Sequence, residues 1–216
     1  MSHLTDFDAA FARCPLVAIL RGVRPDEVEA IGEVLVDAGF TLIEVPLNSP
    51  DPLNSIGRLA TRLAGRAIVG AGTVLRVQDV DAVAAAGGTM IISPNANPAV
   101  IAASASAGLV SLPGTSTPTE AFAALDAGAT ALKLFPAEGS SPAVLKAMLA
   151  VLPKGIRVLP VGGVSPELVK PWLDAGAAGF GLGSALYKPG MTAETVAERA
   201  RDFAAALASA RPAEKQ

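Results

Sequence analysis

Two charged residues stand inside otherwise apolar runs of this sequence, and their types suit them to covalent chemistry. Lys133 lies within Ala-Leu-Lys-Leu-Phe-Pro (131–136), and Glu44 lies within Thr-Leu-Ile-Glu-Val-Pro-Leu (41–47). The other five of the six lysines fall in expected helices, loops or the C-terminal tail. A lysine among apolar neighbours loses hydration, which lowers its pKa toward that of a nucleophilic amine. Such an amine forms a Schiff base with a ketone, and a carboxylate within reach can then move protons.

Side-chain alternation along a strand places these two charges on definite faces. Glu44 shares a face with Leu42, and Lys133 shares a face with Ala131. If both faces point inward, the two charges enter one interior. The alternative is a buried Lys133–Glu44 ion pair that takes part in no reaction. Buried ion pairs occur as structural features, although they stabilise a fold only weakly.

Arg21 and Thr73 follow two further apolar runs. Arg21 comes directly after Leu-Val-Ala-Ile-Leu (16–20), and Thr73 extends the third run in Gly-Ala-Gly-Thr-Val. A guanidinium at the end of a strand suits the bidentate binding of a substrate carboxylate. We therefore expect Arg21 to hold the acid end of a substrate.

Glycines follow the last two runs and could hold an anion. Gly162 and Gly163 end the seventh run, and Gly183 with Ser184 ends the eighth. Glycine lets the backbone approach a phosphate closely, and barrels bind phosphate with the loops after strands seven and eight. The alternative is that these glycines only form tight corners.

The elements that must position these residues alternate along the chain. Helical patterns, several opening at a proline (Pro25, Pro98, Pro118, Pro166), separate eight apolar runs: 16–20, 41–47, 67–74, 90–94, 109–114, 131–136, 157–163 and 179–184. Continuous apolar strands with helices between them indicate a parallel sheet covered by helices. The pattern predicts a single (β/α)8 TIM barrel over residues 1–216, with short loops and an N-terminal extension. The alternative is an open doubly wound sheet.

Composition excludes several other kinds of site. The 216 residues are 51% hydrophobic, 4% aromatic and 17% charged, and they include one His and one Cys. No disulfide within the chain or His/Cys zinc site can form. A Ser-His-Asp triad is disfavoured because His3 lies near the N-terminus, where chains usually fray. The net charge of −3 gives no sign of the excess of basic residues that is typical of nucleic-acid-binding proteins. The polar, acidic N-terminus and the absence of a long apolar run predict a soluble cytoplasmic protein without membrane contact.

Several motifs together resemble the bacterial KDPG/KDPGal aldolase family. In chain order they are Ile-Leu-Arg-Gly (19–22), Glu-Val-Pro-Leu-Asn-Ser-Pro (44–50), Val-Gly-Ala-Gly-Thr-Val-Leu (69–75), Ser-Pro-Asn (93–95), Pro-Gly (113–114), Leu-Lys-Leu-Phe-Pro-Ala (132–137) and Val-Gly-Gly-Val (161–164). The resemblance runs from about residue 16 to residue 190. It is specific because the Lys-Leu-Phe-Pro and Gly-Ala-Gly-Thr-Val-Leu motifs occur in order.

The resemblance implies a class I aldolase that uses no metal and no cofactor, built as a (β/α)8 barrel and usually a homotrimer. It implies a Schiff base at Lys133, a proton shuttle at Glu44 and pyruvate-end contacts from Arg21 and Thr73. It also implies phosphate binding by Gly162, Gly163, Gly183 and Ser184. The expected partner is a small phosphorylated keto-deoxy sugar acid, cleaved to pyruvate and glyceraldehyde 3-phosphate.

Arg21 and Asn48 together look like the galactonate branch of this family. The gluconate branch typically has an arginine where this chain has Asn48, and it lacks one at the position of Arg21. A gluconate-branch aldolase remains the alternative. Two other functions also remain: a sugar-phosphate isomerase with Glu44 as base, and a non-catalytic phosphometabolite-binding protein.

Overall fold

The computed structural model describes residues 3–210, in which strands and helices alternate. The strands are β1 Leu16–Ile19, β2 Leu42–Pro46, β3 Ile68–Gly72, β4 Met90–Ile92, β5 Val110–Leu112, β6 Gly114–Thr115, β7 Leu132–Leu134, β8 Val158–Pro160 and β9 Phe180–Leu182. The helices are α1 His3–Arg13, α2 Val28–Asp37, α3 Pro52–Arg62, α4 Val77–Ala85, α5 Pro98–Ser106, α6 Pro118–Asp126, α7 Pro142–Leu149, α8 Pro166–Asp174 and α9 Ala193–Ala210, with a 3-10 helix, η1, at Ala137–Gly139. Each expected apolar run contains at least one strand.

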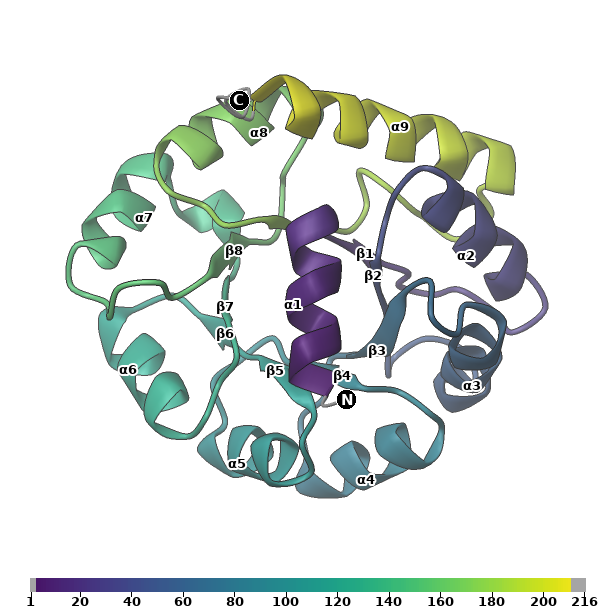
Figure 1. Cartoon of the computed structure of the whole chain (residues 1–216), viewed down its shortest axis with the longest axis horizontal. Coiled ribbons are helices and arrows are strands. Elements are labelled where there is room, and N and C mark those ends of the chain that lie inside the picture. The colour runs from purple at the N-terminus through teal and green to yellow at the C-terminus, as the bar shows by residue number, and fades with distance from the viewer. Residues whose placement is uncertain (1–2, 211–216) are drawn as a thin grey trace.

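The strands form two parallel sheets. A six-stranded sheet has the order β5-β4-β3-β2-β1-β9, and a three-stranded sheet has the order β6-β7-β8. One isolated parallel bridge joins Val161, directly after β8, to Gly181 of β9. The strands surround the centre of the molecule and helices α2 to α9 form an outer layer (Figure 1). The chain is therefore an α/β fold in which the carboxyl ends of the strands point to one side.

The fifth apolar run forms two short strands instead of one. Pro113 separates β5 from β6, because proline has no N–H to donate to a sheet ladder. The expectation of one continuous strand over 109–114 is wrong for this reason. The Pro113 carbonyl nevertheless accepts a hydrogen bond from the backbone N–H of Lys133, at 2.9 Å. The break therefore leaves the register beside Lys133 intact, with Gly114 paired to it.

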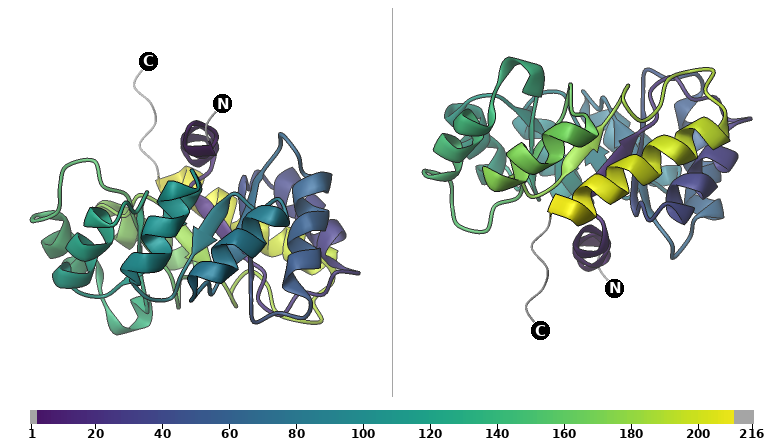
Figure 2. Two further views of the ribbon diagram at one scale, coloured as in Figure 1. Left: turned by 90° about the horizontal axis from the view of Figure 1, so that it is seen from below. Right: turned by 90° about the horizontal axis from the view of Figure 1, so that it is seen from above.

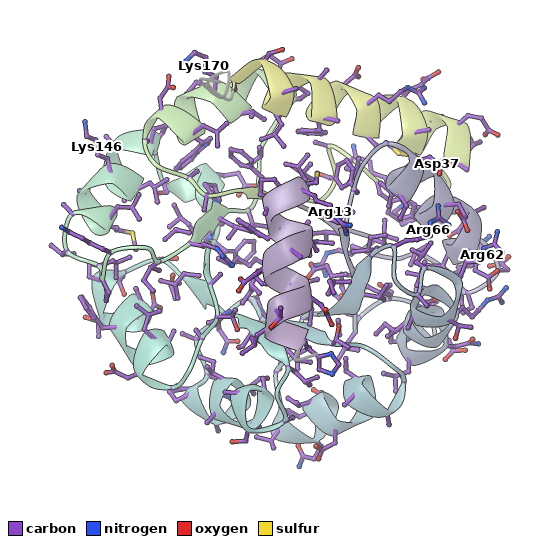
Figure 3. The ribbon with its side chains drawn as sticks, in the orientation of Figure 1. Arg13, Asp37, Arg62, Arg66, Lys146 and Lys170 are labelled. Atoms are coloured by element: carbon purple, nitrogen blue, oxygen red, sulfur yellow. The ribbon has the colours of Figure 1, made fainter. Side chains whose placement is uncertain are left out.

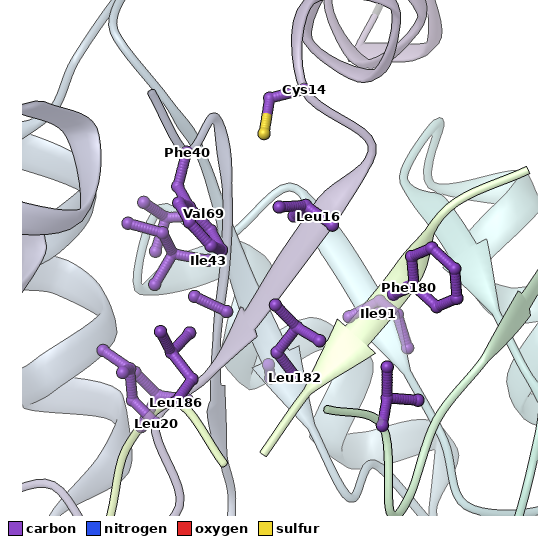
Figure 4. Close-up of a cluster of buried hydrophobic side chains, with 14 of the residues drawn as sticks. Cys14, Leu16, Leu20, Phe40, Ile43, Val69, Ile91, Phe180, Leu182 and Leu186 are labelled. Atoms are coloured by element: carbon purple, nitrogen blue, oxygen red, sulfur yellow. The ribbon is translucent and has the colours of Figure 1, made fainter. Parts of the chain in front are cut away.

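The larger hydrophobic cluster fills the layer between the strands and the outer helices. Figure 4 shows part of it around β1 and β9, where Leu16, Phe180 and Leu182 extend from the two strands. Most of its members are Val, Leu, Ile and Ala. Full burial of one larger aliphatic side chain contributes about 1.5–3 kcal/mol, so this layer supplies much of the stability of the fold.

A second hydrophobic cluster lies on the opposite face of the strands, toward the centre of the molecule. Leu42 and Ala131 belong to it, together with Phe7, Ala10 and Phe11 of α1. The predicted faces of β2 and β7 are therefore the inward faces. Glu44 and Lys133 follow two residues later on the same faces, nearer the carboxyl ends of their strands.

Helix α1 covers the amino ends of the strands and was not predicted from the sequence. Thr41, just before β2, donates a hydrogen bond from Oγ1 to the Ala10 carbonyl at 2.8 Å, and Arg157, just before β8, pairs with Asp8 at 2.6 Å. Figure 1 shows α1 crossing the centre of the molecule, over the strands. His3, expected in a frayed end, is the exposed first residue of this helix.

The two ends of the described chain lie on the same side of the molecule. In both views of Figure 2, α1 and the C-terminal end of α9 lie on one side of the layer of strands and helices. Among residues 3–210, no helix is both long enough and apolar enough to cross a membrane.

Ion pairs join α2 to α3 and the residues after it on the outer surface. Arg58 pairs with Glu29 at 2.7 Å, and both Arg62 and Arg66 pair with Glu33, at 2.6 and 2.8 Å. Figure 3 places Arg62 and Arg66 at the outer rim, with Lys146 and Lys170 also on the rim. Exposed pairs contribute little to stability individually. Their outward placement contrasts with that of Glu44 and Lys133.

Candidate active site

Glu44 and Lys133 are the buried charged residues in the part of the chain that the structure describes. Glu44 is 1% exposed and Lys133 is 6% exposed. β2 and β7 belong to different sheets, so the fold brings the two residues together from distant parts of the chain. Both side chains line one small space among inward-facing apolar residues such as Ile92 and Leu112.

Gly72 of β3 leaves the space that the Glu44 carboxylate occupies. A Cβ at position 72 would lie 2.7 Å from the Glu44 Cδ and from both carboxylate oxygens. Any side chain there would therefore displace the carboxylate. Sequence reasoning missed this role, although a glycine on the strand beside an inward-facing acid was a usable signal.

Burial shifts the pKa of both residues toward their uncharged forms. Burial lowers the pKa of the Lys133 amine; the Glu44 carboxylate opposes this shift, and the positive charge of Arg21 adds to it. Burial raises the pKa of Glu44, and the positive charges of Lys133 and Arg21 oppose that shift. The Lys133 Nζ lies 4.6 Å from the centroid of the Phe135 ring. An amine with a lowered pKa is neutral over more of the physiological pH range and can act as a nucleophile.

The contacts between these two residues differ from those of a structural ion pair. No salt bridge joins Lys133 to Glu44 among the residues described. Glu44 Oε2 is buried and has no hydrogen-bond partner within residues 3–210. A buried carboxylate oxygen without a partner is costly and is typical of functional sites. The geometry leaves both groups available to a third molecule.

A cavity of about 550 Å³ opens above Lys133 at the carboxyl ends of the strands. Its lining includes six of the eight residues expected in a site: Arg21, Lys133, Gly162, Gly163, Gly183 and Ser184. Glu44 lies deeper, in the small space that it shares with Lys133. Thr73 lines a neighbouring hollow with Asn48 and contacts Arg21, which lines the cavity.

Arg21 is held by residues of two adjacent strand ends. Its Nη1 donates a hydrogen bond to Asn48 Oδ1 at 2.7 Å, and its Nη2 lies 3.5 Å from Thr73 Oγ1. Thr73 has a φ of 56°, a left-handed conformation that is unusual for a β-branched residue. Such strained positions cluster at functional sites, and here the strain accompanies the contact with Arg21.

The two glycines after β8 carry backbone donors that no group within residues 3–210 uses. Gly162 and Gly163 have φ values of 109° and 62°, in the region that favours glycine. Neither backbone N–H donates a hydrogen bond to another residue in the described part of the chain. The carboxylate of Glu138 packs against both glycines, a contact that sequence reasoning missed. Paired free N–H groups at such a turn suit an anion.

Arg199 of α9 fixes the other glycine-containing loop. Its Nη1 donates hydrogen bonds to the carbonyls of Ser184 and Ala185, at 3.4 and 3.1 Å. A Cβ at Gly183 would meet nothing within 4 Å, so this side of the cavity is open. Arg199 lies far along the chain, and sequence reasoning did not connect it to the site.

Comparison with known proteins gives a consistent result. A sequence model of the family described as KDPG and KHG aldolase matches residues 7–201. The chain is 46% identical to the 2-dehydro-3-deoxy-6-phosphogalactonate aldolase of Escherichia coli K12, over 92% of this chain and 97% of that protein. It is 31% identical to the 2-dehydro-3-deoxy-phosphogluconate aldolase of Zymomonas mobilis, over 79% of this chain and 81% of that protein.

Solved structures agree with the sequence comparisons. A structure described as native KDPGal matches with a TM-score of 0.91 and 46% identity, and the match covers 92% of this chain and 96% of that one. The family match spans nearly all of the described residues and includes every residue of the candidate site. The chain therefore belongs to the KDPG and KHG aldolase family, whose members are carbon–carbon lyases.

Proposed function

We propose that this aldolase cleaves 2-dehydro-3-deoxy-6-phosphogalactonate to pyruvate and glyceraldehyde 3-phosphate through a Schiff base on Lys133. The observation that carries the proposal is the buried Lys133 amine, whose pKa burial lowers, at the floor of the cavity. A neutral amine facing a cavity can attack a ketone, whereas the lysines at the rim face open water.

The reaction begins when the Lys133 Nζ adds to the C2 carbonyl of the substrate. The resulting carbinolamine loses water to form a protonated imine, and Glu44 supplies and removes the protons of this step. Glu44 then accepts the proton of the C4 hydroxyl, directly or through a water molecule, as the C3–C4 bond breaks. The bond electrons move to the imine nitrogen and leave an enamine, and the C4 fragment departs as glyceraldehyde 3-phosphate. Protonation at C3 and hydrolysis release pyruvate and regenerate the amine.

We expect the two anionic ends of the substrate to bind different residues of the cavity lining. Arg21, with Thr73 beside it, binds the carboxylate next to C2 by charge-assisted hydrogen bonds. The free backbone N–H groups of Gly162 and Gly163, together with Gly183 and Ser184, bind the 6-phosphate. Lys133 lines the same cavity as these residues, which supports an assignment in which the reacting carbons lie beside its Nζ.

The galactonate substrate is favoured over its gluconate epimer by two observations. Arg21 is held in the cavity by Asn48, the pair expected of the galactonate branch. The chain is also more similar to the galactonate relative than to the gluconate one. The gluconate epimer is the alternative substrate, and cleavage kinetics on both epimers decide between them.

We further propose that the two sheets form one closed (β/α)8 barrel, with residues 1–216 as a single domain and α1 as its N-terminal extension. The Val161–Gly181 bridge supports closure at one junction of the sheets, and the hydrogen bond from the Lys133 N–H to the Pro113 carbonyl between β5 and β6 supports it at the other. We also propose a homotrimer in the cytoplasm, which the family resemblance supports. Light scattering coupled to size exclusion tests the trimer.

Borohydride trapping tests the central step. Pyruvate and borohydride should add the mass of the reduced pyruvate adduct to Lys133, and peptide mass spectrometry should locate it there. Lys133→Met should abolish the adduct, whereas Lys146→Met, on the outer rim, should leave it unchanged. A sugar-phosphate isomerase would turn over without any adduct. A phosphometabolite-binding protein would gain thermal stability from sugar phosphates without turnover. Either result would refute the aldolase mechanism.

A further inference from the structure

Two adjacent residues of the loop after β2 accept hydrogen bonds from the loop after β1. Asn48 Oδ1 accepts a hydrogen bond from Arg21 Nη1 at 2.7 Å, and Ser49 Oγ accepts one from the backbone N–H of Gly22 at 2.9 Å. Ser49 is 8% exposed, so its contact is shielded from water. The side chain and the following backbone of Arg21 are therefore both fixed by the neighbouring strand end.

The loop after β9 confines the same segment from its other side. Gly22 has a φ of 83°, and a Cβ there would lie 2.7 Å from Pro189 Cγ. The chain beside Arg21 therefore has little freedom to move toward either neighbour. The Arg21 residue is exposed to solvent, yet the backbone next to it and the Nη1 atom of its guanidinium are fixed by neighbouring residues.

The contacts of Arg21 leave part of its guanidinium for a ligand. Nη1 is committed to the Asn48 amide oxygen, while the contact of Nη2 with Thr73 Oγ1 is long, at 3.5 Å. An amide oxygen accepts a hydrogen bond without neutralising the guanidinium. A carboxylate in the same place would pair with Arg21 and compete with an anionic substrate.

We propose that Asn48 is a positioning residue that orients Arg21 for the substrate carboxylate, and that its neutral amide keeps the arginine charge available. Ser49 supports the same loop through Gly22. The inference rests on the proposed role of Arg21 as the carboxylate-binding residue. The inference also requires that the hydrogen-bond acceptor at position 48 be uncharged. The role of Arg21 in binding the carboxylate does not by itself require this.

The decisive variant is Asn48→Asp, which keeps the shape of the side chain and adds a negative charge. At pH 8 we expect KM for the substrate to rise about 10- to 100-fold, since a charge-assisted pair with Arg21 must be displaced, while kcat changes less than about threefold. Asn48→Ala should raise KM by only about 3- to 10-fold. The pyruvate concentration for half-maximal trapping at Lys133 should rise in parallel.

A salt series separates positioning from a general structural defect. The pair with Arg21 keeps the introduced carboxyl charged, so its effect should respond to ionic strength. As ionic strength rises from about 0.05 M to about 0.5 M, screening of this partly exposed pair should reduce the ratio of variant to unaltered KM. Asp51, Arg76 and Asp79 line the same hollow as Asn48 and are present in both proteins, so the ratio isolates the new charge. Asn48→Ala should show no such salt dependence in its ratio.

Asn97→Asp is the matched control. Asn97 caps α5 by accepting a hydrogen bond from the Ala99 N–H, a place where aspartate also serves well. The same charge change there should leave KM within about twofold. The inference is overturned if Asn48→Asp forms the pyruvate adduct with unchanged KM, or if Asn97→Asp raises KM equally. If Asn48→Asp fails to fold, an unchanged KM in Asn48→Ala overturns it. Absence of the adduct in the unaltered protein refutes the proposed function instead.

Discussion

Gly72→Ala should impair catalysis by moving one carboxylate. The new Cβ would lie 2.7 Å from three atoms of the Glu44 carboxyl group, whereas ordinary contact begins near 3.4 Å. The backbone of Gly72 is outside the left-handed region, so alanine is compatible with its conformation. The strand is paired on both sides, so Glu44 is the group that must yield.

The size of the effect follows from this overlap. Glu44 must retreat by about 0.7 Å or more, and a misplacement near 1 Å can reduce catalysis about 100-fold. The fold should lose about 1–3 kcal/mol of unfolding free energy, the usual cost of overpacking a close-packed interior. We therefore expect kcat to fall about 100-fold in a protein that still unfolds cooperatively.

The assay measures pyruvate release and urea unfolding in parallel. Gly139→Ala is the matched control, because a Cβ there meets nothing within 4 Å, and it should leave kcat unchanged. A double-mutant cycle with Glu44→Ala isolates the contact. Removing the carboxylate first should abolish the stability cost of Gly72→Ala. Full activity in Gly72→Ala, or the same cost in both backgrounds, would refute the reasoning.

Three further predictions concern charge and packing. Glu44→Gln should abolish turnover. It should nevertheless raise the unfolding free energy by about 1 kcal/mol at pH 8. Burial raises the pKa of Glu44, so the charged carboxylate present at that pH opposes folding, and glutamine removes this charge. That gain should shrink as pH falls toward the ordinary value of 4.5, and a gain that grows instead would contradict it. Glu138→Gln should lower KM about threefold at low salt and less at high salt, because the carboxylate against Gly162 repels a phosphate; an unchanged KM at low salt counts against that assignment. Phe7→Ala should cost about 3–5 kcal/mol in urea unfolding, since Phe7 is fully buried, and a loss below about 1 kcal/mol would mean that α1 is dispensable.

The inward placement of Glu44 and Lys133 was predictable because it depends only on local rules. Alternation along a strand fixes the face of a side chain once Leu42 and Ala131 are recognised as core residues. The place of the glycines after β8 in the cavity lining was predictable for a similar reason, since they follow a strand directly, and their binding of an anion stays a prediction.

Other parts of the site depend on how separate loops meet. Arg21 and Asn48 are 27 residues apart, and nothing in either local sequence specifies their hydrogen bond. The contact of Glu138 with Gly162 likewise depends on the path of the chain after β7. Helix α1 was missed although Phe7, Ala10 and Phe11 have helical spacing, because the surface that stabilises it consists of strand ends from across the chain.

The position of the two chain ends has a practical consequence for attaching this enzyme to a support. Helix α1 covers the amino ends of the strands, and α9 ends on the same side, whereas the cavity opens at the carboxyl ends. A fusion partner, affinity handle or bead joined at either end would therefore lie on the side away from the cavity opening. Substrate could reach an immobilised monolayer of the enzyme from the free side, and two different cargoes could be attached without obstructing it.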